Sequence, residues 1–177
     1  MNNPKIDSLF DQMKTEAGHM LAELNTWSAD ELRQSAPDTW NALQVLEHVM
    51  VSEFGTLGYL KKKISAPADT LEMVGKAHTS SGDQLSAALK STRQWKAPDV
   101  LPGPTGADDL AMATAKWRAL HEGFAAFLGQ LPDAYADRLV FRHPFAGMLS
   151  LEQTLVFLRD HIIHHMHQLQ RIKAGRA

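Results

Sequence analysis

Apolar residues recur every three or four positions over four long stretches of this chain, and this periodicity favours packed helices over any sheet fold. The stretches span residues 4–26, 41–62, 108–131 and 151–173. In the first of them, Leu9, Met13, Met20 and Leu24 fall on one helical face. Four long amphipathic helices with one long connection are typical of a four-helix bundle. We therefore predict an all-α fold in which residues 1–177 form a single domain.

Capping patterns mark where several of these helices begin. A short polar residue followed three positions later by Glu or Gln satisfies the free N–H groups of a helix start. Three pairs have this form: Ser28 with Glu31, Asn41 with Gln44, and Ser150 with Gln153. The first predicts a short helical turn at 29–34. Pro132 ends the third long helix, and Gly175 ends the last one.

The helical signal is weaker between residues 64 and 110, where Pro67, Pro98, Pro102 and Pro104 interrupt many small polar residues. We expect a long crossover there, with helical pieces near 68–77 and 82–93. Residues 139–142 are strand-like but too few to support a sheet. Residues 142–149 are predicted to form a structured loop, because they include a proline and a glycine.

Composition excludes several classes of function. Hydrophobic residues make up 44% and charged residues 21%, as in ordinary soluble proteins. The absence of cysteine rules out disulfides, thiolate nucleophiles and cysteine zinc sites. Nothing resembles a membrane span or a secretory signal, so a cytoplasmic location is expected. The net charge is −2 and the sequence has no basic stripe, so we predict no nucleic-acid binding. The three consecutive lysines at positions 61–63 are interpreted as a solvated helix end.

Histidine is the unusual residue of this chain, with nine copies, four of them between positions 161 and 167. His161 and His165 are one helical turn apart, close enough to share a metal ion, although histidines at this spacing also occur on protein surfaces. A third ligand is needed, and His48 is the best candidate because its helix pattern predicts burial. The alternative is a core histidine with a hydrogen-bond partner. Bundle metal sites are built from inward side chains on facing helices, which favours the metal interpretation.

The remaining polar residues are weaker candidates for a site. Ser52, Gly55 and Tyr59 share the face of His48 and predict room beside it. Glu53 is about 140° away around the same helix and is not expected to be a ligand. His164, Gln168 and Tyr59 could act as a general base or orient a ligand. His19 lies off the apolar face of the first helix, and His78 lies in the region of weak helical signal. His121 is interpreted as solvated beside Glu122, and His167 as solvent-facing. His143 could line the mouth of a pocket or simply belong to a loop.

Three segments carry a resemblance to a known family. Residues 39–48, from Thr39 to His48, look like the tryptophan-then-helix segment of the DinB-like superfamily of metal-binding bundles, which ends in the first ligand histidine. Residues 143–153 are similar to the loop and helix start of one branch. Residues 161–168 fit the family pattern H-x-x-H-H-x-x-Q, whose first and third histidines bind metal. The chain departs from the family at Met166 and His167, where Arg-Gly often stands.

The resemblance implies an up-down-down-up bundle with the 64–110 crossover between its second and third helices. It also implies a divalent metal, zinc or nickel, held by His48, His161 and His165, and a homodimer. Some members transfer low-molecular-weight thiols such as mycothiol or bacillithiol, and others are presumed hydrolases. A three-histidine site with an open fourth position is of the catalytic type. We therefore expect a metal-dependent hydrolase or thiol transferase acting on a small molecule, with no catalytic residue assigned. The alternatives are a non-catalytic bundle that binds metal or a small ligand, and a plain helical dimer whose histidines stay empty.

Overall fold

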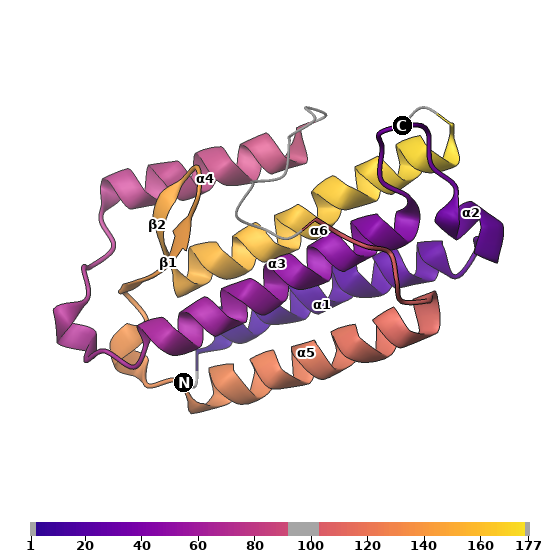
Figure 1. Ribbon diagram of the computed structural model, residues 1–177. Helices are drawn as coiled ribbons and strands as arrows, with labels where there is room; N and C mark the ends of the chain where they lie inside the picture. The colour runs from indigo at the N-terminus through magenta and orange to yellow at the C-terminus, as the bar shows by residue number, and fades with distance from the viewer. Residues whose placement is uncertain (1–2, 92–102, 176–177) are drawn as a thin grey trace.

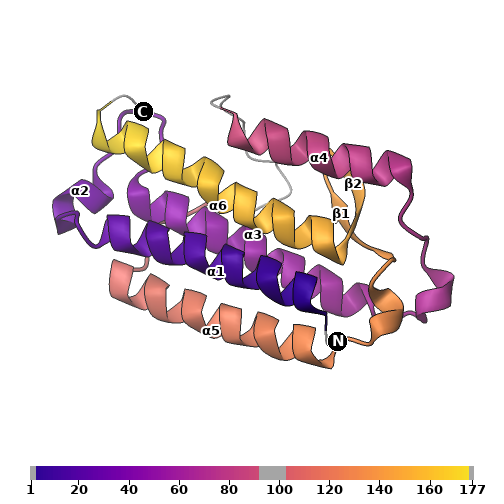
Figure 2. The same cartoon turned by 180° about the vertical axis from the view of Figure 1, so that it is seen from behind.

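Four long helices form a bundle in the computed structural model, which describes residues 3–91 and 103–175. They are α1 (Pro4–Leu24), α3 (Ala42–Lys63), α5 (Leu110–Gln130) and α6 (Leu151–Lys173). Helices α1 and α6 run in one direction along the bundle, and α3 and α5 run in the other (Figure 1). The short α2 (Ala29–Arg33) joins α1 to α3 at the end where α6 finishes, as the reverse view also shows (Figure 2). The predicted helical-bundle fold is confirmed.

Helix starts follow the capping patterns of the sequence. Ser28, Asn41 and Ser150 each accept a hydrogen bond from the backbone N–H three residues on, while the Glu or Gln at that position accepts from the cap residue's own N–H. At the other end of α6, Gly175 has φ +64°, a backbone conformation that glycine adopts without strain. These local bonds set where the helices begin and end. The packing of the helices against one another is set by the apolar core.

The core lies along the shared axis of the bundle, where each long helix contributes its apolar face. Buried apolar side chains of this size each stabilise a fold by roughly 1.5–3 kcal/mol, so together they fix how each helix is rotated. That rotation decides which polar residues are carried inside. The largest side chains that are fully buried on the four helices are Met13, Met20, Leu24, Leu46, Leu60, Trp117, Phe124, Leu151, Leu155 and Leu158.

The described part of the crossover between α3 and α5 contains one α-helix, which does not match either of the two predicted pieces. A short 3-10 turn, η1 (Ala68–Thr70), is followed by α4 (Lys76–Lys90), which lies along α6 (Figures 1 and 2). The predicted break between residues 77 and 82 is therefore wrong. The predicted end at residues 92 and 93 lies outside the described residues. Helix α4 begins where the Gly75 N–H donates to Nδ1 of His78, at 3.2 Å.

Contacts with α6 explain why α4 is helical despite its weak signal. The side-chain amide of Gln153 donates to the carbonyl of His78 at 2.6 Å, and His164 Nδ1 bonds the carbonyl of Leu89 at 3.1 Å. Between them, the hydroxyl of Ser86 donates to the buried carboxylate of Asp160. Tertiary packing of this kind routinely overrides weak local propensity.

A small β-hairpin precedes α6, and the expectation that this region could not form a sheet is wrong. Strands β1 (Leu139–His143) and β2 (Gly147–Ser150) pair antiparallel, with His143 opposite Gly147 and a bulge near Phe141. Gly147 has φ +74°, which turns the chain back immediately after residues 144–146. Most of the predicted loop at 142–149 therefore lies in strands. The hairpin packs on α3 and on the start of α6.

The outer surface of the helices is polar in character. Lys61, Lys62 and Lys63 occupy the last turn of α3, where their charge complements the negative end of the helix dipole. Among residues 3–91 and 103–175, no helix is both long enough and apolar enough to cross a membrane.

Candidate metal centre

The three histidines predicted from the sequence come together where α3 packs on α6. The ring centroids of His48 and His161 are 5.2 Å apart, those of His48 and His165 are 4.8 Å apart, and those of His161 and His165 are 4.5 Å apart. One nitrogen from each ring lies within 4.8 Å of the other two. Bonds of about 2.0–2.1 Å to a tetrahedral zinc ion would hold such nitrogens about 3.3 Å apart. Small side-chain adjustments would therefore let this group hold one metal ion.

The position of the histidines follows from the apolar pattern around them. His48 lies between Val45 and Val49, both fully buried, so the rotation of α3 turns it inward. On α6, His161 and His165 flank Ile162, which is also fully buried. The three histidine side chains are 4%, 9% and 6% exposed, which places them inside the bundle rather than on a solvated face.

Burial makes all three rings neutral at physiological pH. It is the main reason that the pKa of His48 falls to about 4 and that of His165 to about 3. The pKa of His161 lies well below its usual value, first because the ring is buried and then because His165 and His48 would repel its charge. A neutral imidazole with a free lone pair is the form that binds metal.

A polar neighbour fixes which nitrogen of the His165 ring carries the proton. Nδ1 of His165 lies 2.8 Å from the side-chain oxygen of Gln168, which can only accept, so this nitrogen carries the proton and Nε2 keeps its lone pair. That Nε2 lies 3.0 Å from Nε2 of His161. Nδ1 of His161 is buried and has no hydrogen-bond partner among the described residues. The two Nε2 atoms therefore face each other beside a third ring, and an ion that took the place of the hydrogen bond between them would have three imidazole nitrogens around it.

Other residues near the centre have roles of their own. His164 is buried, and its Nδ1 is engaged with the carbonyl of Leu89, so it fastens α4 to α6. The Tyr59 ring is 36% exposed and packs on Phe141 of the hairpin. On the other side, the Trp40 ring lies 4.9 Å from that of His48. A Cβ added at Gly55 would meet nothing within 4 Å, which leaves open space on this face of α3.

Two interpretations of single histidines are corrected by the structure. His121 is not solvated, because only 13% of its side chain is exposed and its Nε2 lies 2.9 Å from Glu53. His167 is half-buried rather than solvent-facing, and its Nδ1 is among the buried atoms without a partner in the described part of the chain. His121 is covered by Glu53 of α3 and by the Phe10 ring of α1, which the sequence alone does not place beside it.

A second buried polar cluster was missed. Glu53 is only 1% exposed, and its Oε2 accepts from the Trp117 indole at 2.7 Å as well as contacting His121. Glu53 does not join the three histidines, as expected. Its burial could have been recognised from its spacing, because it lies one turn from both Val49 and Leu57 on the apolar stripe of α3.

His143 is not a loop residue, because it ends strand β1 and is 7% exposed. Its ring meets the edge of Phe157 at 4.6 Å, and Phe157 in turn lies 5.5 Å from the ring of His161. The residue is therefore one aromatic ring away from the centre. Burial lowers the pKa of His143 to about 4, so it is neutral at physiological pH.

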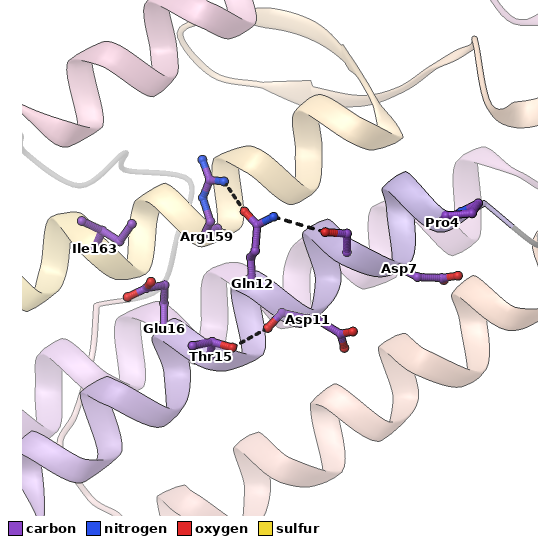
Figure 3. Close-up of a pocket in the computed structure, with 9 residues that line it drawn as sticks. Pro4, Asp7, Asp11, Gln12, Thr15, Glu16, Arg159 and Ile163 are labelled. Carbon is purple, nitrogen blue, oxygen red and sulfur yellow. Dashed lines mark hydrogen bonds between the residues drawn. The ribbon is translucent and has the colours of Figure 1, made fainter.

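A pocket of about 700 Å³ lies elsewhere, between α1 and α6 (Figure 3). Two of its charged residues are engaged within the protein: Arg159 pairs with Asp160 at 2.7 Å and donates to Gln12 at 2.7 Å, and Asp11 pairs with Lys14. None of the three clustered histidines lines it. The chemistry of this chain is therefore concentrated at the histidines rather than in this pocket.

Comparison with known proteins agrees with the geometry. The family model described as the DinB superfamily matches residues 12–169, a span that includes all three histidines. The chain has no match among curated proteins and none among solved structures.

Proposed function

The chain belongs to the DinB superfamily, and on this premise we propose that His48, His161 and His165 bind one divalent ion, zinc or nickel, in a metal-dependent enzyme that acts on a small molecule. The observation that carries the proposal is the convergence of three buried, neutral imidazoles within 4.8 Å. The homodimer implied by the resemblance is part of the proposal and would be checked by light scattering.

The donor set supports a catalytic rather than a structural site. Structural zinc is normally closed by four protein ligands, and only three residues form the group found among the described residues. A divalent ion held with an open position makes a bound water or thiol more acidic and polarises a carbonyl group. Hydrolysis and thiol transfer both use this property, and the three histidines have the same role in each.

The absence of cysteine bears on the second reaction. This chain cannot supply a thiol itself, so a thiol nucleophile would arrive as a small molecule. Hydrolysis would need only water in addition to the substrate. The two reactions therefore differ in what binds beside the histidines, and both belong to the proposal.

One observation favours a binding protein without turnover as the alternative. The polar side chains next to the ligands are already engaged, Gln168 with His165 and His164 with the carbonyl of Leu89. A general base must lie within hydrogen-bond reach of the bound nucleophile, and neither residue is free to act as one in this arrangement.

Elemental analysis of untagged protein tests the metal. We expect close to one equivalent of zinc or nickel per chain, and its loss in His48→Ala. The matched control is His19→Ala, which removes a histidine whose side chain is 63% exposed and should leave the metal content unchanged. Retention of a full equivalent by His48→Ala, or no metal in the wild-type protein, would contradict the proposal.

A substrate panel then separates the enzyme from the binding protein. The metal-loaded protein would be assayed with thiol adducts and with small esters and amides. Turnover that disappears in His48→Ala would support the enzyme. A protein that holds its metal but turns over nothing in either class would favour the binding alternative.

A further inference from the structure

The hairpin turn that follows His143 determines which nitrogen of its ring carries the proton. Nδ1 of His143 lies 3.2 Å from the backbone nitrogen of Phe145 and 3.2 Å from that of Ala146. Both backbone groups are N–H donors, so Nδ1 must accept. In the neutral imidazole the proton then sits on Nε2, on the edge of the ring away from the turn.

That second edge is a hydrogen-bond donor without a partner among residues 3–91 and 103–175. The residue is only 7% exposed, yet Nε2 is not among the buried atoms that lack a partner in the described part of the chain, so solvent reaches this edge of the ring. A donor that is accessible on an otherwise buried ring is available to an acceptor on a molecule that enters from outside.

The surroundings of His143 connect it to the candidate metal centre. Its ring contacts Phe157, which stands one helical turn before His161 and packs against that ring. A positive charge on His143 would lower the pKa of His161. Two further aromatic residues extend the same wall: Phe141 stacks on Phe157 at 6.0 Å, and Tyr59 meets Phe141 at 5.4 Å.

We propose that His143 is a substrate-binding residue whose Nε2–H donates a hydrogen bond to an acceptor oxygen of a small molecule held at the three histidines. This inference rests on the proposed function and adds a substrate class to it. The ligand carries a carbonyl, carboxylate or similar oxygen near its metal-binding atom, and an apolar or aromatic body lies against Phe157 and Phe141. The hairpin thus supplies one specific polar contact in an otherwise aromatic wall.

Two substitutions separate the two edges of the ring. In His143→Asn the side-chain oxygen can take the place of Nδ1 and accept from the turn, but nothing reaches the position of Nε2. In His143→Gln the longer amide can donate near the position of Nε2, and the turn loses its acceptor. The Asn variant therefore removes the proposed substrate contact, and the Gln variant removes the structural one.

The test uses Co²⁺-loaded protein with benzohydroxamate as the probe, because this molecule has acceptor oxygens and an aromatic ring. Absorption titration gives the affinity for Co²⁺ and then for the probe. We expect unchanged Co²⁺ binding in both variants. The affinity for benzohydroxamate should fall about ten-fold in His143→Asn, as for one lost hydrogen bond, and stay within about three-fold of wild type in His143→Gln. Thermal unfolding should show the reverse order, with the Gln variant less stable.

A spectroscopic measurement on the wild-type protein gives an independent result. Long-range ¹H–¹⁵N spectra of the Zn²⁺-loaded protein should show His143 with its proton on Nε2, and this signal should move when benzohydroxamate is added. A proton on Nδ1, or a signal that does not respond, would overturn the inference.

The outcomes distinguish this inference from the metal proposal. Normal Co²⁺ binding with equal probe affinity in wild type and His143→Asn would overturn the role of His143 alone. Equal losses in both variants would assign the residue to packing, and no binding of benzohydroxamate by the Co²⁺ protein would also reject the inference. If the wild-type protein bound no Co²⁺, the metal centre itself would be rejected, and the role of His143 with it.

Discussion

Helix α3 carries two buried polar groups that face different partners. Glu53 turns toward α5, where it meets Trp117 and His121, and His48 turns toward α6, where it meets His161 and His165. The two residues are five positions apart on one helix and are similarly buried. Their surroundings differ in kind. In the α5 cluster a carboxylate oxygen faces two ring nitrogens, whereas the α6 cluster gathers three rings of the same type.

This difference separates a polar group that stabilises a fold from one that is suited to bind a ligand. Oε2 of Glu53 accepts at 2.7 Å from an indole and lies 2.9 Å from an imidazole, so this oxygen is paired within the protein, whereas Oε1 has no hydrogen-bond partner among the described residues. Among the histidines, two Nε2 atoms face each other at 3.0 Å and a third ring stands beside them. Three buried imidazoles of the same type should be stabilised more by a cation bound between them than a cluster of paired polar groups would be.

Removing the carboxylate should have the largest effect on stability. In Glu53→Ala, the indole of Trp117 and the ring of His121 are left buried without their acceptor. We expect the free energy of unfolding to fall by about 3–5 kcal/mol. Urea denaturation measures this change, and elemental analysis of the folded protein should still find one equivalent of metal. Loss of metal together with stability would mean that the two clusters are not independent.

Acid should act mainly on the histidine cluster. The pKa of His48 in the folded state is about 4, below the roughly 6.5 of an unfolded histidine, so the unfolded chain binds more protons between these values. Stability is therefore full above about pH 6.5 and is lost as the pH falls toward 4. In the metal-free protein this one ring should account for a loss of about 2 kcal/mol between pH 7.5 and pH 5.

Calorimetry of variants identifies the groups responsible for this pH dependence. His48→Leu should flatten the dependence, because it removes one of the protonations that oppose folding. His19→Leu, at an exposed site, should keep the wild-type dependence. An identical curve for wild type and His48→Leu would show that burial at this centre does not control the acid response.

The orienting bond to His165 should have an intermediate effect, and only on metal affinity. Gln168→Leu removes the acceptor 2.8 Å from Nδ1 of His165, which fixes the tautomer of that ring. Losses at such positions are typically 10–100-fold in metal affinity. Competition with a zinc chelator measures the change. Gln170→Leu, at an exposed position of the same helix, is the control and should bind zinc as wild type does.

A single donor in the α5 cluster should have the smallest effect. Trp117→Phe keeps an aromatic ring in the core but loses the N–H that donates to Glu53. We expect the free energy of unfolding to fall by about 1–2 kcal/mol, with unchanged zinc affinity. If urea denaturation showed no change, the indole–carboxylate bond would not be a source of stability.

Helical spacing predicts contacts between residues that are close in sequence, and the histidine centre contains one such pair. His161 and His165 are one turn apart, so their proximity follows from the helix itself. Placing His48 beside them also required the packing of α3 on α6, for which the bundle pattern and the family resemblance of residues 39–48 gave a signal. The Glu53 cluster is different, because Glu53 and Trp117 are 64 positions apart and only the packing of α3 on α5 brings them together.

The hairpin is also difficult to predict from local sequence patterns. Strand β1 is five residues long and its partner four, which is too short for a clear alternating pattern. The pairing depends on the turn at Gly147 and on packing against α3 and α6. In the sequence, the nearby Pro144 and Gly147 instead indicate a loop or a pocket mouth for His143. Its tautomer can be recognised only once the backbone of Phe145 and Ala146 is in place.

The attachment of α4 to α6 has a consequence for how the chain tolerates change. Asp160, which accepts from the Ser86 hydroxyl, directly precedes the candidate ligand His161, and His164, which holds the end of α4, directly precedes the candidate ligand His165. Any substitution that shifts α4 should therefore also shift the helical turns that orient these two rings. Sequence change in α4 is thus constrained by the geometry of a histidine cluster that lies on α3 and α6.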